Sequence, residues 1–361
     1  MPLRHNRRSV GFPALRHPIV LAPLAGGPST PALAAAVTNA GGLGFVAGGY
    51  LTAEALDERI REARALTDGA IGVNLFLLHA VPIDEEALAA YTAELEPEAR
   101  RRGVELGEAV FEDDGWDAKL EVVLDRGVEV VSTTFGCPPA GAVRRLREAG
   151  TSVWLTVGSL PEARAARAAG ADAIVLQGVE GGGHRASWAD EEDADVPTLE
   201  LLQAAAAEIE VPLVATGGIA DGAGIAAALV AGARAAQLGT AFLLCAEAGT
   251  HEAHRRALRA GGSTALTRAF TGRRARGIVN EFMRRYVDAP SAYPHVHHLT
   301  APLRAAARAV GDADGFNLWA GERFERSREL PAGALVEQLA AELADHSSRV
   351  PGTEVPGTGQ R

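Results

Sequence analysis

A histidine directly after three consecutive glycines is the most chemically suggestive feature of the sequence. Gly181, Gly182 and Gly183 precede His184, and Gln177 stands shortly before them. Glycine stabilises neither helix nor strand interiors, so such a run allows the backbone to lie flat against a bulky ligand. An imidazole changes charge near neutral pH and can therefore accept or donate a proton. An exposed loop histidine is the simpler alternative, but the adjacent glycines favour a functional, proton-handling one.

Two further glycine-rich turns suggest a phosphate site. Gly217 and Gly218 follow one apolar run, and Gly239 with Thr240 follows the next. Glycine allows backbone N–H groups to approach phosphate oxygens, and a helix that begins there adds a favourable potential. Either turn alone could be only a tight connection. Together they match the two adjacent strands after which barrel enzymes bind phosphate, so the sequence predicts a phosphate-bearing ligand.

Two other apolar runs end in residues that suit a planar ligand. Asn74 could hydrogen-bond the edge of a heterocycle, with a capping or turn role as the alternative. Ala22, Pro23 and Leu24 end the first run, where proline removes a backbone N–H and shapes the loop. Cys137 also follows a run, but a packed bystander thiol is the default interpretation.

The histidine clusters do not predict a metal site. His251 and His254 flank a glutamate but lack the spacing of a metalloprotease helix. His295, His297 and His298 lie close together without an accompanying carboxylate cluster.

The elements that must position these residues are short apolar runs alternating with alanine-rich amphipathic runs. Two units, EARAARAAGADAIVLQG and GAGIAAALVAGARAAQLGT, repeat the order of helix, strand and glycine turn. Repetition of this kind predicts an α/β fold, a (β/α)₈ TIM barrel; an open doubly wound sheet is the alternative. We expect eight buried parallel strands, at 19–22, 44–47, 71–75, 128–132, 152–156, 173–177, 213–216 and 235–238.

Helices are expected to begin near Pro31, Pro161 and Gly222. A longer charged helical stretch at 84–112 does not fit the repeat. The domain organisation that we predict is a TIM barrel at 1–242, which binds the phosphate-bearing ligand, with a small helical lobe inserted after the last strand. That lobe (243–290) covers the active site, a C-terminal segment (291–346) returns to the barrel through a helix near 300–311, and a disordered tail (347–361) follows.

The bulk properties exclude several classes of protein. A formal net charge of −11 argues against nucleic-acid binding and against adhesion to anionic membranes. No apolar stretch is long enough to span a bilayer, and the basic N-terminus lacks the apolar run of a signal peptide. Two cysteines fit a reducing cytoplasm, so we expect a cytoplasmic protein with a small-molecule partner, either a monomer or a homodimer.

Taken together, these motifs resemble the nitronate monooxygenase family, formerly called 2-nitropropane dioxygenases. The resemblance covers residues 18–322. It rests on PIVLAPLAGGPSTPALAAAVTNAGGLG, GVNLF, VSTTFGCP, LQGVEGGGH, VATGGIADG, QLGTAF, YPHVHHLTAPLR and NLWAGE.

The resemblance implies an FMN-containing barrel that oxidises alkyl nitronates, such as propionate 3-nitronate, with O₂ to a carbonyl compound and nitrite. It implies an active-site role for His184, as a base toward neutral nitroalkanes or as a group that holds the nitronate. The FMN contacts that it implies are Ala22, Pro23, Leu24, Asn74, Gln177, Gly182, Gly183, Gly217, Gly218, Gly239 and Thr240.

Three positions depart from the family pattern. Leu24 replaces a common methionine, Gly181 replaces an alanine and Glu322 replaces a glutamine. A carboxylate at 322 would repel an anionic nitronate if it touched the substrate.

Two other functions remain open at this level. One is an NAD(P)H-dependent FMN reductase acting on quinones or enoyl thioesters, because similar barrels share the glycine–histidine loop. The other is a non-catalytic flavin-binding protein, against which the presence of His184 argues.

Overall fold

The computed structural model describes residues 11–190 and 195–349 and confirms the (β/α)₈ barrel. Eight parallel strands pair in the order β1-β9-β8-β6-β5-β4-β3-β2, and a parallel bridge between Val20 and Leu43 joins the two end strands. The barrel strands are β1 Ile19–Leu21, β2 Gly44–Ala47, β3 Ile71–Phe76, β4 Val130–Thr134, β5 Ser152–Val157, β6 Ala173–Gln177, β8 Leu213–Thr216 and β9 Ala235–Leu238. These bounds agree with the predicted runs to within two residues.

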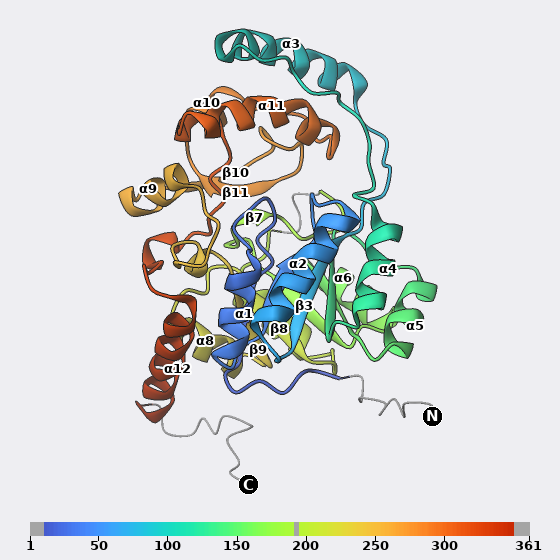
Figure 1. Ribbon diagram of the computed structural model, residues 1–361, viewed down its shortest axis with the longest axis vertical. Coiled ribbons are helices and arrows are strands. Elements are labelled where there is room, and N and C mark those ends of the chain that lie inside the picture. The colour runs from blue at the N-terminus through green and yellow to red at the C-terminus, as the bar shows by residue number, and fades with distance from the viewer. Residues whose placement is uncertain (1–10, 191–194, 350–361) are drawn as a thin grey trace.

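Helices cover the outside of the barrel, and a second group of elements stands over one of its ends (Figure 1). The barrel helices are α1 Pro31–Asn39, α2 Ala53–Leu66, α4 Trp116–Arg126, α5 Ala140–Glu148, α6 Leu160–Ala168, α7 Thr198–Ala206, α8 Gly222–Val230 and α12 Ala332–Arg349. The remaining elements are α3 Glu85–Arg102, β7 Gly183–His184, η2 Thr240–Phe242, α9 Glu252–Ala260, β10 Thr264–Thr267, β11 Ala275–Ile278, α10 Glu281–Arg285, α11 His295–Ala309, η3 Ala313–Gly315 and η4 Phe324–Arg326.

The predicted helix starts are confirmed, and their caps explain them. Thr30 accepts a hydrogen bond from the N–H of Leu33 and caps α1, while Asp221 accepts one from Gly224 and caps α8. A side chain that accepts from the third residue of a helix satisfies one of the unpaired N–H groups of its first turn.

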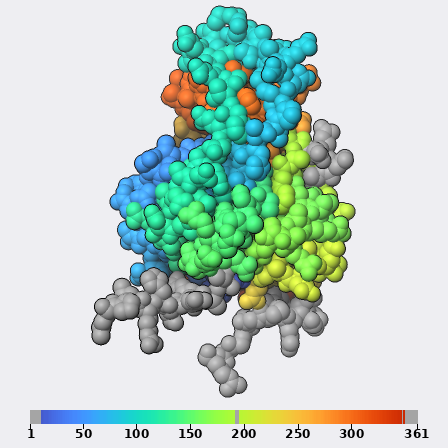
Figure 2. Space-filling model, turned by 90° about the vertical axis from the view of Figure 1, so that its right-hand side faces the viewer, coloured from blue at the N-terminus to red at the C-terminus, as the bar shows by residue number. Residues whose placement is uncertain are grey.

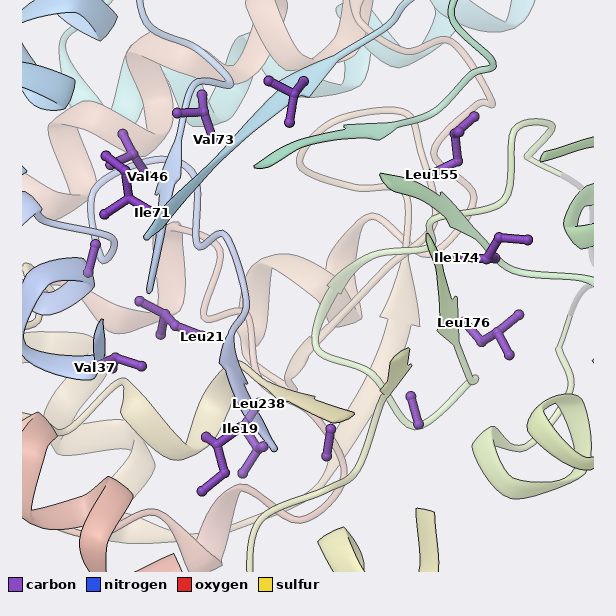
Figure 3. Close-up of a cluster of buried hydrophobic side chains, with 14 of the residues drawn as sticks. Ile19, Leu21, Val37, Val46, Ile71, Val73, Leu155, Ile174, Leu176 and Leu238 are labelled. Atoms are coloured by element: carbon purple, nitrogen blue, oxygen red, sulfur yellow. The ribbon is translucent and has the colours of Figure 1, made fainter. Parts of the chain in front are cut away.

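Side chains alternate between the two faces of each barrel strand, so one set forms an outer apolar layer and the other set forms an inner layer. Residues of one parity, such as Ile19, Leu21, Leu155, Ile174 and Leu176, pack against the helices (Figure 3). Because successive strand residues point to opposite faces, the other parity points into the barrel. The part of the interior near the amino ends of the strands is filled by a second apolar cluster. Its members are Val20, Leu43, Phe45, Val130, Trp154, Ala173, Val175, Val214 and Ala235. Apart from Ser152 at the start of β5, the polar residues of this parity therefore lie toward the carboxyl ends of the strands.

The lobe over the barrel mouth is made of two parts of the chain that are distant in sequence. Tyr91 and Leu95 of α3 pack in one buried cluster with Phe270, Phe282 and Leu299. Figure 2 shows this part of the molecule standing above the barrel. The lobe also contains a three-stranded antiparallel sheet in the order β10-β11-β7.

The return of the chain to the barrel differs from the expectation. The predicted helix near 300–311 belongs to α11, which packs against α3 within the lobe, so its assignment to the barrel was wrong. The helix that returns is α12, which packs against α1 and α8 through residues such as Leu335, Val336 and Leu339. Helix α12 extends through Arg349, and the rest of the expected tail lies outside the described residues. The domain boundaries themselves stay a prediction.

Candidate active site

A cavity of about 380 Å³ lies at the carboxyl ends of the barrel strands, beneath the lobe. Every residue of the predicted site lines this cavity or a smaller one beside it. Those on the larger cavity are Ala22, Pro23, Leu24, Asn74, Gln177, Gly182, Gly183, His184, Gly239 and Thr240. Gly217 and Gly218 line the smaller cavity, which shares Gln237, Gly239 and Thr240 with the larger one. The structure thus gathers residues from the ends of several strands, while their individual roles stay a prediction.

Asn74 presents a hydrogen-bond acceptor at the end of β3. Its carboxamide nitrogen donates to Ser132 Oγ at 2.9 Å and to Thr134 Oγ1 at 3.0 Å. Among the described residues nothing donates to its carboxamide oxygen. The two hydroxyls therefore fix the orientation of the amide, and its oxygen is left to accept from a ring N–H of a ligand.

The side chain of Gln177 makes its hydrogen bonds to the loop after β6. Its Oε1 accepts from Arg185 Nη1 and from the backbone N–H of Ala186, both at 2.8 Å, and its Nε2 donates to the His184 carbonyl at 3.0 Å. These bonds tie the end of β6 to the segment that carries the histidine. The expected flavin contact of Gln177 stays a prediction, but its amide groups already hold the loop in place.

The lobe positions His184 directly. His184 forms the two-residue strand β7 with Gly183, and it pairs with Ala275 of β11. Its Nε2 lies 2.9 Å from Thr271 Oγ1. Since the Thr271 hydroxyl donates to the Arg273 carbonyl at 3.2 Å, it accepts from His184, which places the proton on Nε2 and leaves Nδ1 as the basic nitrogen.

Four aromatic or cationic neighbours surround the imidazole. The ring centroids of Phe135, Tyr293 and Trp319 lie 5.7, 5.5 and 5.6 Å from that of His184. The Arg273 guanidinium lies over the Phe135 ring, 4.4 Å from its centroid. These side chains place polarisable faces around the half-buried histidine and reduce its contact with water.

The electrostatics of this site favour anions. Burial, followed by the charge of Arg273, lowers the pKa of His184 to about 3, so the imidazole is neutral at physiological pH. Arg304 is buried, and burial lowers its pKa to about 10. Its guanidinium donates to Thr300 and His297, and no described carboxylate pairs with it. Asp190 partly offsets the charge of Arg273, whereas the charge of Arg304 leaves a positive potential beside the neutral histidine that a negative ligand would relieve.

Sequence reasoning missed the aromatic residues of the site. Tyr50 lies in the loop after β2, Phe135 begins the loop after β4, and they have positive φ angles of 66° and 77°. Non-glycine residues in this region are strained, and such strain is concentrated at functional sites. The Tyr50 ring stacks on His297 with centroids 4.3 Å apart, and its backbone N–H donates to Asp114 Oδ1 at 2.9 Å. No local sequence signal marks these conformations.

The smaller cavity has the features of a phosphate site. Gly218 has a φ of +65°, and a Cβ there would lie 2.9 Å from that of Glu180. Arg323 also lines this cavity and supplies a positive charge that the sequence motifs did not indicate. Helix α8 begins just beyond, at Gly222. A glycine turn, a guanidinium and a helix N-terminus together suit a phosphate dianion.

Two residues singled out by sequence lie away from the cavities that hold His184 and the glycine turns. Glu322 pairs with Arg276 at 3.0 Å and lines neither of these cavities, which removes the concern about repulsion of an anion. Cys137 lines a separate cavity of about 520 Å³, and burial raises the pKa of its thiol. A thiol of raised pKa is a poor nucleophile.

The described residues contain no group of three or more His, Cys, Asp or Glu side chains suited to a metal ion. Nor does any helix in the described part of the chain have the length and apolar content to cross a membrane.

Three histidines, the buried His254 and the half-buried His184 and His297, should make the fold sensitive to acid. Burial is the main cause that lowers the pKa to about 3 for His184, about 4 for His254 and about 2 for His297. As pH falls below about 6.5, the unfolded chain binds protons that the folded chain does not, so stability is lost toward the folded pKa values. At about pH 5 the loss is about 2 kcal/mol for each histidine.

We therefore expect denaturant titrations at pH 7 and pH 5, with saturating flavin, to show much lower stability at pH 5. His297→Gln should reduce the difference between the two pH values by about 2 kcal/mol. An unchanged difference in that variant would show that His297 titrates normally in the folded protein.

The fold and the site together define a class: TIM-barrel enzymes that bind a phosphate-bearing ligand at the barrel mouth, beneath a lobe. A family model described as nitronate monooxygenase matches residues 12–342. The nitronate monooxygenase of Pseudomonas aeruginosa is 42% identical over 348 residues, covering 91% of this chain and 97% of that protein. That of Paraburkholderia phytofirmans is 41% identical over 337 residues, covering 90% and 92%.

Solved structures support the same family assignment. Nitroalkane oxidase from Streptomyces ansochromogenes superimposes with a TM-score of 0.91 at 49% identity, covering 93% of this chain and 98% of that one. FabK from Thermotoga maritima gives 0.74 at 29% identity, covering 94% and 96%. The chain belongs to the nitronate monooxygenase family, a family of flavin-dependent oxidoreductases that oxidise nitronates.

Proposed function

We propose that this protein uses FMN and O₂ to oxidise small alkyl nitronates, such as propionate 3-nitronate, to a carbonyl compound and nitrite. The observation that carries the proposal is the neutral His184 on the cavity, whose pKa is lowered by burial and by the nearby charges of Arg273 and Arg304. Family membership supports nitronate oxidation, and this environment supports an anionic substrate.

The cavity suits FMN in its donor and acceptor pattern. The Asn74 oxygen is available to a ring N–H, and the cavity with Gly217, Gly218 and Arg323 suits the phosphate. When bound, FMN supplies the redox chemistry by taking electrons from the substrate.

The protein's own contribution begins with binding. Neither Arg273 nor Arg304 lines the cavity of His184, but both charges act on that histidine and attract an anionic nitronate beside it through a medium of low dielectric. Tyr293, Phe135 and Trp319 keep bulk water away, which strengthens these interactions.

His184 acts on the proton when the substrate arrives as a neutral nitroalkane. Its Nδ1 accepts the proton from the carbon next to the nitro group, while Thr271 holds Nε2–H. A pKa of about 3 makes the imidazole a weak base before the substrate binds. The nitronate that forms as the proton leaves stabilises the imidazolium, so base strength increases along the reaction.

Simultaneous measurement of oxygen uptake and nitrite release during turnover of propionate 3-nitronate tests this proposal. We expect both, with a rate that depends on added FMN in flavin-stripped protein. Oxygen uptake without nitrite, or no response to the nitronate, would contradict the proposal.

A further inference from the structure

The cavity that His184 lines also contains a cation that the chemistry above does not use. Arg308 of α11 lines the same cavity as His184, together with Asn317 and with His254 of α9. These side chains come from the lobe, beside the loop of Leu24 and Gly26.

The charge of Arg308 lacks a counter-ion in the described part of the chain. Its Nη2 donates to the Asn317 Oδ1 at 2.8 Å, and its guanidinium lies 5.1 Å from the centroid of the Phe316 ring. Burial lowers its pKa, and no neighbouring acid opposes that shift. A guanidinium has five N–H donors, so most of its capacity remains for a ligand in the cavity.

His254 adds no competing negative charge. Burial, and then the charge of Arg308, lowers its pKa to about 4, so it is neutral at physiological pH. A hydrogen bond with the Trp319 backbone holds the ring, and among the described residues its Nε2 has no hydrogen-bond partner. The nearest acid on the same helix, Glu252, pairs with Arg259 at 2.9 Å instead.

We propose that Arg308, positioned by Asn317 and Phe316, binds a carboxylate group carried by the nitronate substrate. The planar guanidinium matches a carboxylate with two parallel hydrogen bonds, and partial burial strengthens the pair. This inference rests on the proposed function and narrows it, because it selects nitronates that bear an acid over those that bear only an alkyl chain.

The first test compares two nitronates of the same length. Propionate 3-nitronate bears a carboxylate and propyl-1-nitronate does not. In Arg308→Met we expect KM for propionate 3-nitronate to rise at least about tenfold, while KM for propyl-1-nitronate changes less than about twofold and kcat stays similar. Arg167→Met, which removes an exposed arginine of α6, is the matched control and should change neither constant.

A second variant keeps the guanidinium of Arg308 but gives it a carboxylate partner within the protein. Asn317→Asp places a carboxylate where the amide oxygen now accepts from Arg308. We expect the same selective rise in KM, since the new internal partner competes with the substrate. Calorimetric titration with 3-nitropropionate should show weaker binding in both variants, independently of turnover.

The outcomes separate the two proposals. If both nitronates lose affinity equally in Arg308→Met, or neither does, the carboxylate subsite is wrong while nitronate oxidation stands. If sulfate competes equally with both nitronates in the wild type, the arginine is a general anion site and the proposal is also wrong. If the wild type oxidises neither nitronate, the proposed function itself fails.

Discussion

Replacing His184 with asparagine is expected to lower kcat/KM for neutral nitroalkanes by about 10² to 10⁴, the usual contribution of a general base. Asparagine retains a donor for Thr271 but has no basic nitrogen. Preformed nitronates need no proton abstraction, so their turnover should fall much less. Steady-state kinetics with nitroethane and with its nitronate measure the difference.

Thr271→Val is the matched control for this prediction. It removes the hydroxyl that orients Nε2 but leaves the imidazole. We expect a smaller loss with both substrate forms, and flavin binding should be unchanged in both variants. Equal losses for the nitroalkane and the nitronate in His184→Asn would show that the histidine binds substrate and does not act as the base.

Substituting Gly218 with alanine is expected to weaken FMN binding by at least about tenfold, because phosphate recognition depends on backbone N–H groups in this turn. The left-handed φ of +65° disfavours alanine, and the new Cβ would lie 2.9 Å from that of Glu180. Fluorescence titration of flavin-stripped protein gives the dissociation constant.

Gly127→Ala is the matched control, because it introduces similar backbone strain at a glycine outside the phosphate turn. Gly127 ends α4 with a φ of +58°, and a Cβ there would have no atom within 4 Å, so the backbone penalty is similar and the site is untouched. Both variants should lose about 1 kcal/mol of stability. Similar FMN affinity in the two variants would mean that phosphate does not bind at Gly218.

The parts of the fold that depend on neighbours in sequence were predictable. Short β-branched runs and glycine punctuation located the barrel strands, because buried parallel strands follow the same local pattern in each unit. The glycine turns of the site were found for the same reason, since barrel topology brings the carboxyl ends of all strands together. Strand parity would also have indicated inward-facing Ser132, Thr134 and Gln237.

The parts that depend on the lobe were not predictable. His184 pairs with Ala275, and Tyr91 packs with Phe270, across long separations in sequence. Nothing local marks Arg304 as a buried neighbour of the site or Arg308 as a cavity residue, because both lie in an alanine-rich helix that resembles an ordinary amphipathic one. The helix near 300–311 was assigned to the barrel because its sequence shows only that one face is apolar. Such a face can pack against a lobe as well as against a barrel sheet.

Nitronate oxidation by the bound flavin is tested most directly by anaerobic mixing of the flavin-loaded protein with propionate 3-nitronate and, separately, with NADH, while flavin absorbance is followed. We expect a rapid change in the flavin spectrum with the nitronate and none with NADH. Rapid bleaching by NADH with no response to the nitronate would contradict nitronate oxidation and would identify the protein as a nicotinamide-dependent flavin reductase.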